Sequence, residues 1–314
     1  MTEATEKNLE DYLARLSLDS VSHRDFGTIR DFLKLLRATK QRVSPLVVKY
    51  GAPLIEKGFS SMEEIEAWEV CEQVFLAALD SHAKEVAQKI FLKIEKKFGS
   101  TSLRVQRLKG LYLEMQGKFQ EADKVYNQIL EKDPTNTLVM KRQVCLRKQL
   151  GDVPAAIKLL NEYLKIFMGD TDAWLELADM YIDQNMLKQA AFCFEEAILA
   201  GPTNYHYYIK YAELQYSIGG VENLKLARKY FSGAAELSET PRALYGIITS
   251  CYALASAKNS KQLEQQYLAQ NMSLFEWAYD KLAQQYKEQN PSKLELLKAF
   301  TEASKTSKEL PDDK

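Results

Sequence analysis

Histidines and cysteines are the side chains of this sequence best suited to hold a metal ion or to act as a base or nucleophile. They are spread along the chain, at His23, Cys71, His82, Cys145, Cys193, His206 and Cys251. Metal sites usually draw two ligands from closely spaced positions, as in C-x-x-C or H-E-x-x-H, and this sequence contains neither pattern. We therefore predict no metal site. Cysteines this far apart are typical of buried thiols in a reducing compartment.

Motifs for phosphate binding and for paired-carboxylate catalysis are not found either. The glycines of GGVEN, which begin at Gly219, lack the Lys-Ser/Thr pair and the preceding strand of a P-loop. Glu195 and Glu196 are adjacent, so they do not face each other on a helix. We therefore predict no catalytic residues and no cofactor, which indicates that the protein is not an enzyme.

The chain carries almost no net charge and has no apolar run of membrane-spanning length. Its 314 residues have a formal net charge of −1, with 46% hydrophobic and 27% charged residues. This composition is typical of a soluble globular protein and argues against nucleic acid as a partner. Residues 24–49 hold a local excess of seven Lys or Arg over two Asp, for which an exposed helix face is favoured over a site for acidic partners.

Small and large hydrophobic residues recur at intervals of 34 through the middle of the chain. The small residues are Ala122, Ala156, Ala190 and, after three extra residues, Ala227; the large ones, four residues further on, are Tyr126, Leu160, Phe194 and Phe231. A spacing of four keeps both on one helix face. The same interval relates Gly117, Gly151, Asn185 and Gly219, which are residue types that tolerate positive φ after a helix. The pattern predicts helical hairpins with tight turns.

One unit, residues 171–204, resembles the tetratricopeptide repeat throughout its signature. The matching residues are Trp174, Leu177, Ala178, Tyr181, Ala190, Phe194, Ala197 and Pro202. The resemblance implies an all-α fold, a tetratricopeptide-repeat (TPR) array stacked as a right-handed superhelical solenoid. Because the period fades towards both ends, we expect N-terminal capping helices at 1–60, the repeat array at 61–256, and C-terminal helices with a loose tail at 257–314.

Local signals predict several element boundaries in these flanks. The segment GAP at 51–53 is expected to break a helix. The pattern SSMEE at 60–64 is expected to cap and start a helix near Met62. Further helices are expected near 263–287 and after Pro291.

In such arrays the first helix of each unit lines the concave surface, so polar residues of these helices form the candidate partner-binding groove. By repeat register they are Arg104, Arg107, Glu114, Lys141, Lys148, Asp172, Asp179, Asp183, His206, Glu213 and Tyr216. Basic side chains dominate before residue 150 and acidic ones after residue 171. This division would orient a bound segment by its charge, although the solubility of an exposed surface explains the same pattern.

Three segments resemble one family more closely than they resemble tetratricopeptide repeats in general: 130–152, 160–182 and 188–231. They are similar to the second-subunit family of the endoplasmic reticulum (ER) membrane protein complex, and GGVENLKLARKYF at 219–231 is the most specific part. The resemblance implies a peripheral, cytosolic scaffold in a complex that inserts tail-anchored and multi-pass proteins into the ER membrane. It also implies a hetero-oligomer, with the cytosolic subunit eight or nine and the cytosolic tails of membrane subunits as partners.

A soluble co-chaperone adaptor that binds chaperone C-terminal tails is the alternative function for a TPR protein. Its carboxylate clamp places an Asn four residues after a Lys on the first helix of a unit. Here Cys145 follows Lys141 at that spacing, so the sequence favours the scaffold.

Overall fold

The computed structural model describes residues 26–256 and 265–306, with side chains placed for 26–256 and 269–301. Over this part of the chain the secondary structure is helical and contains no strand, which confirms the all-α prediction. The helices form two compact units, residues 1–152 and 153–314. The first part of the expected N-terminal cap, residues 1–25, and the tail from residue 307 lie outside the described residues.

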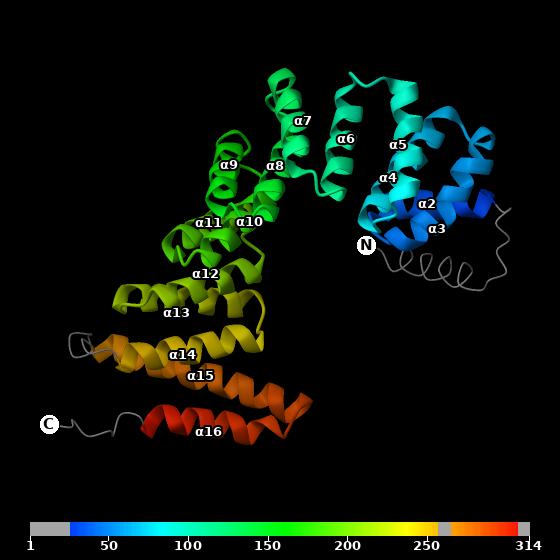
Figure 1. Cartoon of the computed structure of the whole chain (residues 1–314). Helices are drawn as coiled ribbons and strands as arrows, with labels where there is room; N and C mark the ends of the chain where they lie inside the picture. The colour runs from blue at the N-terminus through cyan, green and yellow to red at the C-terminus, as the bar shows by residue number, and fades with distance from the viewer. Residues whose placement is uncertain (1–25, 257–264, 307–314) are drawn as a thin grey trace. The chain divides into compact units, whose positions relative to one another are not determined.

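The first unit is a succession of helices in which each one packs against the next in the chain (Figure 1). In order they are α2 (Phe26–Thr39), α3 (Ser44–Lys57), the 3-10 helix η1 (Phe59–Ser61), α4 (Glu64–Asp80), α5 (Lys84–Phe98), α6 (Leu103–Met115), α7 (Phe119–Lys132) and α8 (Thr137–Gln149). The pairs α4 with α5 and α6 with α7 are the predicted helical hairpins, and α4 also contacts α6.

Within the second unit, too, each helix packs against the next in the chain. Its helices are α9 (Val153–Ile166), α10 (Thr171–Asp183), α11 (Leu187–Ala200), α12 (Tyr205–Ile218), α13 (Val221–Leu237), α14 (Pro241–Ser256), α15 (Gln265–Gln289) and α16 (Lys293–Thr306). Helix α13 has 17 residues against 14 in α11, which accommodates the extra residues of the fourth unit. The helices predicted near 263–287 and after Pro291 are α15 and α16. Among the described helices, none is both long enough and apolar enough to cross a bilayer.

Small residues let adjacent helices approach, as the 34-residue pattern predicts. A Cβ atom added to Gly110 would lie 2.3 Å from Cε1 of Tyr126, and one added to Gly246 would lie 2.3 Å from the ring of Phe231. The repeating alanines are all fully buried: Ala122, Ala156, Ala190 and Ala227. The hairpins are therefore held by large side chains that fill the space which small residues leave.

The turns inside the hairpins have the predicted left-handed residue. The φ angles are 76° at Gly117, 75° at Gly151, 57° at Asn185 and 76° at Gly219. His82, with φ of 52°, occupies the equivalent position between α4 and α5, which the sequence pattern did not reveal. There the amide of Ala83 donates to the carbonyl of Ala78 at 2.9 Å, as the amide of Lys118 does to Leu113. This is the hydrogen bond that closes a Schellman turn.

One predicted helix break and one predicted helix cap were wrong. Helix α3 runs through the segment 51–53 and carries Pro53 in its interior. The missing Cβ of Gly51 explains this, because a Cβ there would lie 2.3 Å from Cγ2 of Val74, so the glycine permits close packing of α3 on α4. Helix α4 begins at Glu64, close to the predicted start near Met62, but its N-cap residue is Glu63 and it has no side-chain cap. The hydroxyl of Ser61 donates instead to the carbonyl of Gly58 at 2.6 Å.

The four cysteines are free thiols, and three of them are buried. Burial raises the pKa of Cys71 to about 11 and the pKa values of Cys193 and Cys251 to about 12. Cys145, on α8, is half-buried. The buried thiols act as small hydrophobic side chains in the helix packing.

Candidate partner-binding surfaces

Arg104 and Arg107 lie in the first two turns of α6, where they share a carboxylate of α4. The Arg104 Nε atom lies 2.7 Å from Oε2 of Glu72, and the Arg107 Nη2 atom lies 2.9 Å from Oε1 of the same side chain. Glu72 was not among the predicted groove residues, although it precedes Arg107 by about one repeat. It neutralises part of the basic charge that the sequence assigned to this surface.

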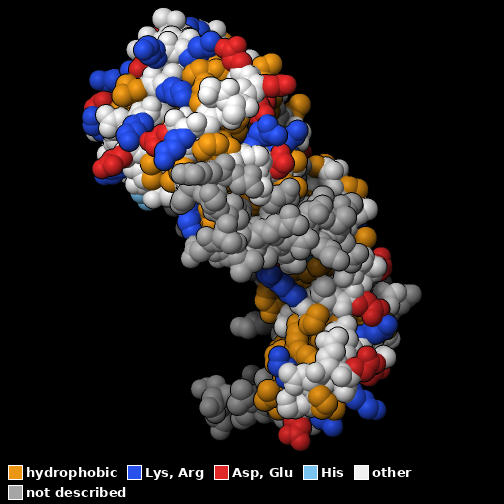
Figure 2. Space-filling model, turned by 90° about the vertical axis from the view of Figure 1, so that its right-hand side faces the viewer, with side chains coloured by type: hydrophobic (Ala, Val, Ile, Leu, Met, Phe, Trp, Pro, Cys, Tyr) orange, Lys and Arg blue, Asp and Glu red, His pale blue; other side chains and the backbone are white. Residues whose placement is uncertain are grey.

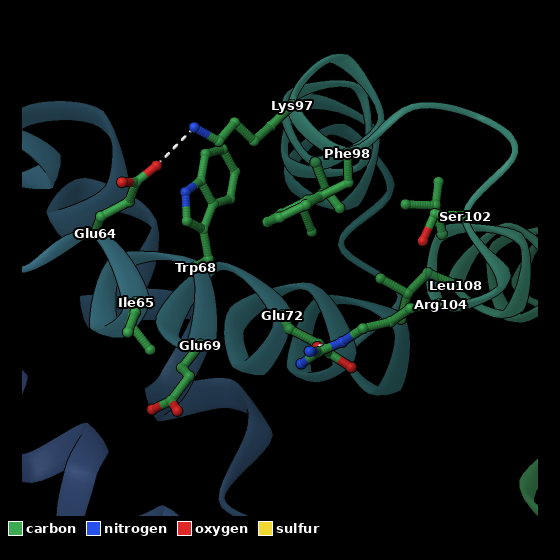
Figure 3. A pocket seen from close by; sticks show the side chains of 12 residues that line it. Glu64, Ile65, Trp68, Glu69, Glu72, Lys97, Phe98, Ser102, Arg104 and Leu108 are labelled. Carbon is green, nitrogen blue, oxygen red and sulfur yellow. Dashed lines mark hydrogen bonds and ion pairs between the residues drawn. The ribbon is translucent and has the colours of Figure 1, made fainter.

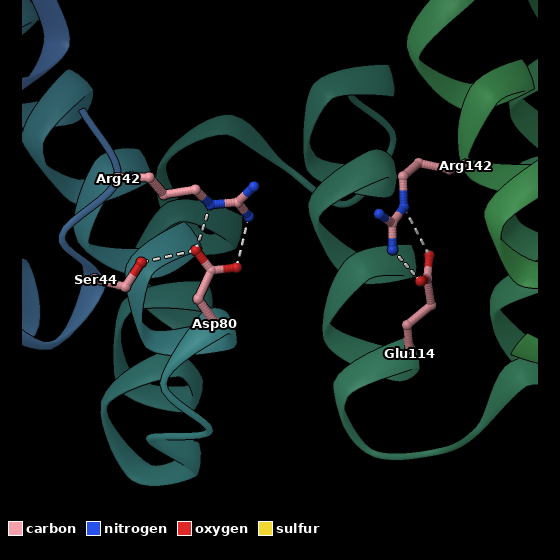
Figure 4. A network of polar contacts seen from close by, with 5 residues as sticks. All are labelled: Arg42, Ser44, Asp80, Glu114 and Arg142. Carbon is pink, nitrogen blue, oxygen red and sulfur yellow. Dashed lines mark hydrogen bonds and ion pairs between the residues drawn. The ribbon is translucent and has the colours of Figure 1, made fainter. Parts of the chain in front are cut away.

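Glu114, predicted for the groove, is instead a buried residue between three helices. Its side chain is 5% exposed. It accepts a 2.5 Å hydrogen bond from the hydroxyl of Tyr126 on α7. It also pairs with the guanidinium of Arg142 on α8, as Figure 4 shows. Burial, followed by the hydrogen bond to Glu114, raises the pKa of Tyr126 well above its usual value. Burial would lower the pKa of Arg142, but the contacts with Glu114 raise it.

The local excess of basic residues before α4 is balanced by acidic residues of α4. Arg42, just before α3, makes two hydrogen bonds to Asp80 at 2.8 and 2.7 Å, and Ser44 donates to the same carboxylate at 2.8 Å (Figure 4). Burial would raise the pKa of Asp80, but these hydrogen bonds and the charge of Arg42 lower it. Two further pairs are longer, Arg30 with Glu66 at 3.8 Å and Arg37 with Glu69 at 3.7 Å.

The remaining basic candidates of the first unit are Lys141 and Lys148 on α8. They are seven residues apart and therefore share a helix face. Lys141 is half-buried and Lys148 is exposed. In Figure 2, basic and acidic side chains lie interspersed with hydrophobic ones over the upper region, where the N-terminal unit faces the viewer. The first unit thus presents a mixed surface in this view.

The second unit places three of its candidates in one exposed row. Asp172, Asp179 and Asp183 lie on α10 at spacings of seven and four, and all are exposed. Their carboxylates make no hydrogen bond or ion pair with any other residue that the structure describes. We call these three residues the acidic face of α10. An unpaired row of carboxylates of this kind attracts a cationic segment.

The candidates on α12 differ from those on α10. Glu213 is paired through both oxygens with Arg242 of α14, at 2.6 and 2.7 Å, and these contacts raise the pKa of Arg242. His206 is exposed, with its ring centroid 4.0 Å from that of Tyr205. Tyr216 is also exposed. On α12, therefore, the acidic candidate is neutralised by an arginine that repeat register did not reveal.

Comparisons with known proteins identify the family of this chain. The family model described as the EMC2 TPR-like repeat domain matches residues 86–220. The chain is 38% identical over 260 residues to ER membrane protein complex subunit 2 of Xenopus tropicalis, covering 82% of this chain and 86% of that protein. It is 38% identical over 289 residues to the protein of the same name from Dictyostelium discoideum, covering 88% of each.

A solved structure supports the fold alone. The C-terminal part of a TPR repeat-containing protein from Cytophaga hutchinsonii is 12% identical, with a TM-score of 0.51, and the match covers 92% of this chain and 96% of that one. The helical hairpins, the turn residues and the two relatives agree: the chain belongs to the family of ER membrane protein complex subunit 2.

Proposed function

We propose that the chain is a non-enzymatic scaffold on the cytosolic face of the ER membrane. Its family makes it a subunit of the ER membrane protein complex, and hence part of a hetero-oligomer associated with that membrane. Its proposed partners are the cytosolic subunit eight or nine and the cytosolic tails of the membrane subunits. By holding them, the scaffold organises the cytosolic part of a complex that inserts tail-anchored and multi-pass proteins.

The acidic face of α10 is the observation that supports this proposal most directly. Its three carboxylates are exposed and make no ion pair with any described residue, whereas Glu72, Glu114 and Glu213 are neutralised within the chain. Stacked helices also give a rigid support, so that a bound segment loses less freedom than two flexible partners would. A cytosolic tail with Lys or Arg residues would meet complementary charge here.

Charge reversal on α10 tests the scaffold. We expect the triple variant Asp172→Lys, Asp179→Lys and Asp183→Lys to lower the recovery of at least one other subunit by about tenfold, because attraction becomes repulsion. The measurement is affinity purification of the tagged full chain from detergent-solubilised membranes, in cells lacking the native chain, followed by quantitative mass spectrometry.

A matched control changes the same charge elsewhere. Glu121, Glu131 and Glu236 are exposed and lie on the second helices α7 and α13, so their replacement by Lys should leave the recovery unchanged. Equal losses from the two triple variants would show a general charge effect and contradict a role for α10. Digestion of the chain by protease added outside sealed microsomes tests the cytosolic location, and protection would contradict it.

A further inference from the structure

The first unit contains an open pocket of about 420 Å³ between the start of α4, the end of α5 and the start of α6. Its apolar lining includes Ile65 and Trp68 from α4, Phe98 from α5 and Leu108 from α6 (Figure 3). The Trp68 ring packs edge-on between the rings of Phe59 and Phe98. The distances between ring centroids are 5.2 Å to Phe59 and 5.1 Å to Phe98. Three aromatic rings in contact make this wall a preformed apolar surface.

Two apolar side chains of this pocket are turned to solvent. Ile65 is 78% exposed and Phe98 is 49% exposed. Because so much of each side chain is exposed, Ile65 and Phe98 contribute little to the interior packing of the unit. Large hydrophobic residues exposed around a concavity are typical of a surface that another protein covers.

The rim of the pocket carries more acidic than basic side chains. Three carboxylates line it, from Glu64, Glu69 and Glu72, against two cations, from Lys97 and Arg104. The Nζ atom of Lys97 lies 2.6 Å from Oε1 of Glu64, and Arg104 pairs with Glu72. Both cations of the rim are therefore already paired with carboxylates of the chain.

Glu69 is the carboxylate of the rim that is left for an incoming cation. Its side chain is 53% exposed, and its ion pair is the long one, at 3.7 Å from Arg37. Arg37 itself donates a shorter hydrogen bond, of 2.7 Å, to Gln73. Glu69 lies beside Ile65 in Figure 3, so a cation that pairs with it would adjoin an apolar group in the pocket.

We propose that this pocket receives a segment of another subunit, which inserts a large apolar side chain against Trp68 and Phe98 and pairs a neighbouring Lys or Arg with Glu69. The inference rests on the proposed scaffold function and assigns one contact to it. The chain's own residues 1–25 fit the rim less well, because they contain six Asp or Glu against three Lys or Arg. Their charge would repel the carboxylates of the rim.

Site-specific crosslinking in the intact complex tests the occupant. A photoreactive amino acid at position 65 should crosslink to a peptide of another subunit that carries a large apolar residue next to Lys or Arg. The same amino acid at Leu199, which is 76% exposed on α11, serves as the control position and should not give that peptide. Crosslinks from position 65 to residues 1–25, or none in an assembled complex, would overturn the inference.

Substitutions give a second readout. We expect Ile65→Asp to reduce recovery of the crosslinked subunit by about tenfold or more, because the apolar anchor loses its contact, while Leu199→Asp leaves it unchanged. Glu69→Lys should reduce recovery as well, and reversing the charge of the cation in the crosslinked peptide should restore it. If neither Ile65→Asp nor Glu69→Lys reduces recovery of the crosslinked subunit, the inference is wrong. If the wild-type chain recovers no membrane subunit, the scaffold proposal itself fails, which is a separate result.

Discussion

Polar side chains of this protein stabilise the fold by pairing with side chains of other helices. Glu114 shows this most clearly, since one carboxylate joins α6 to the Tyr126 hydroxyl of α7 and the Arg142 guanidinium of α8. Repeat register placed Glu114 on the first helix of its unit, which is where it lies. Repeat register could not show that the Glu114 side chain is buried between helices. Its partners follow it by 12 and 28 residues in the sequence, and neither separation is a recognisable helix or repeat spacing.

Removing this charge should destabilise the fold. We expect Glu114→Gln to lower the free energy of unfolding by about 2–3 kcal/mol, because a partly buried Arg142 is left without its counter-ion. Urea denaturation of the purified chain measures the change, and Glu121→Gln on the exposed face of α7 is the control. An unchanged midpoint for Glu114→Gln would mean that Arg142 reaches solvent without cost.

Helices and their turns were the part of the structure that the sequence predicted best. The hairpins followed from the 34-residue spacing, and the left-handed turn residues followed from Gly117, Gly151 and Asn185. The positive φ of His82 was not foreseen, because histidine, although enriched at positive φ among non-glycine residues, still adopts negative φ in most places and is therefore a weaker signal than glycine. Helix α3 continues through Pro53 because its packing on α4 outweighs the local preference of the sequence.

The close packing of α14 against α13 leads to a prediction about single helices. We expect Gly246→Ala to lower the free energy of unfolding by about 1–3 kcal/mol, because the new methyl group would overlap the Phe231 ring. In the background of Phe231→Leu the same substitution should cost less, and a double-mutant cycle measured by urea denaturation gives the coupling. Additive effects would show that the two residues do not compete for space.

At the scale of the whole chain, the family and the repeat type could be predicted from the sequence, but the occupied surfaces could not. Opposite charges one repeat apart, such as Glu72 and Arg107, fall on equivalent positions, yet only the structure shows that they pair. The pocket beside Trp68 combines residues from three helices, and no spacing signals it. The division into 1–60, 61–256 and 257–314 stays a prediction.

A destabilising substitution in one repeat should loosen only the nearby helices, since each repeat of a stacked array contacts only its neighbours. We expect Glu114→Gln to speed amide hydrogen exchange in α6, α7 and α8 while leaving α13 and α14 unchanged, and Gly246→Ala to do the reverse. Hydrogen exchange followed by mass spectrometry resolves these segments. Faster exchange throughout the chain from either variant would indicate that the protein unfolds as one cooperative body.

The three buried cysteines have a consequence for handling the protein. Peroxides and alkylating reagents attack the thiolate, and with pKa values of about 11 for Cys71 and about 12 for Cys193 and Cys251 these thiols are almost never ionised at neutral pH. Half-buried Cys145 is the more accessible target on the chain. A fluorescent maleimide would therefore mark α8 selectively, and the native sequence can carry such a dye without cysteine replacement.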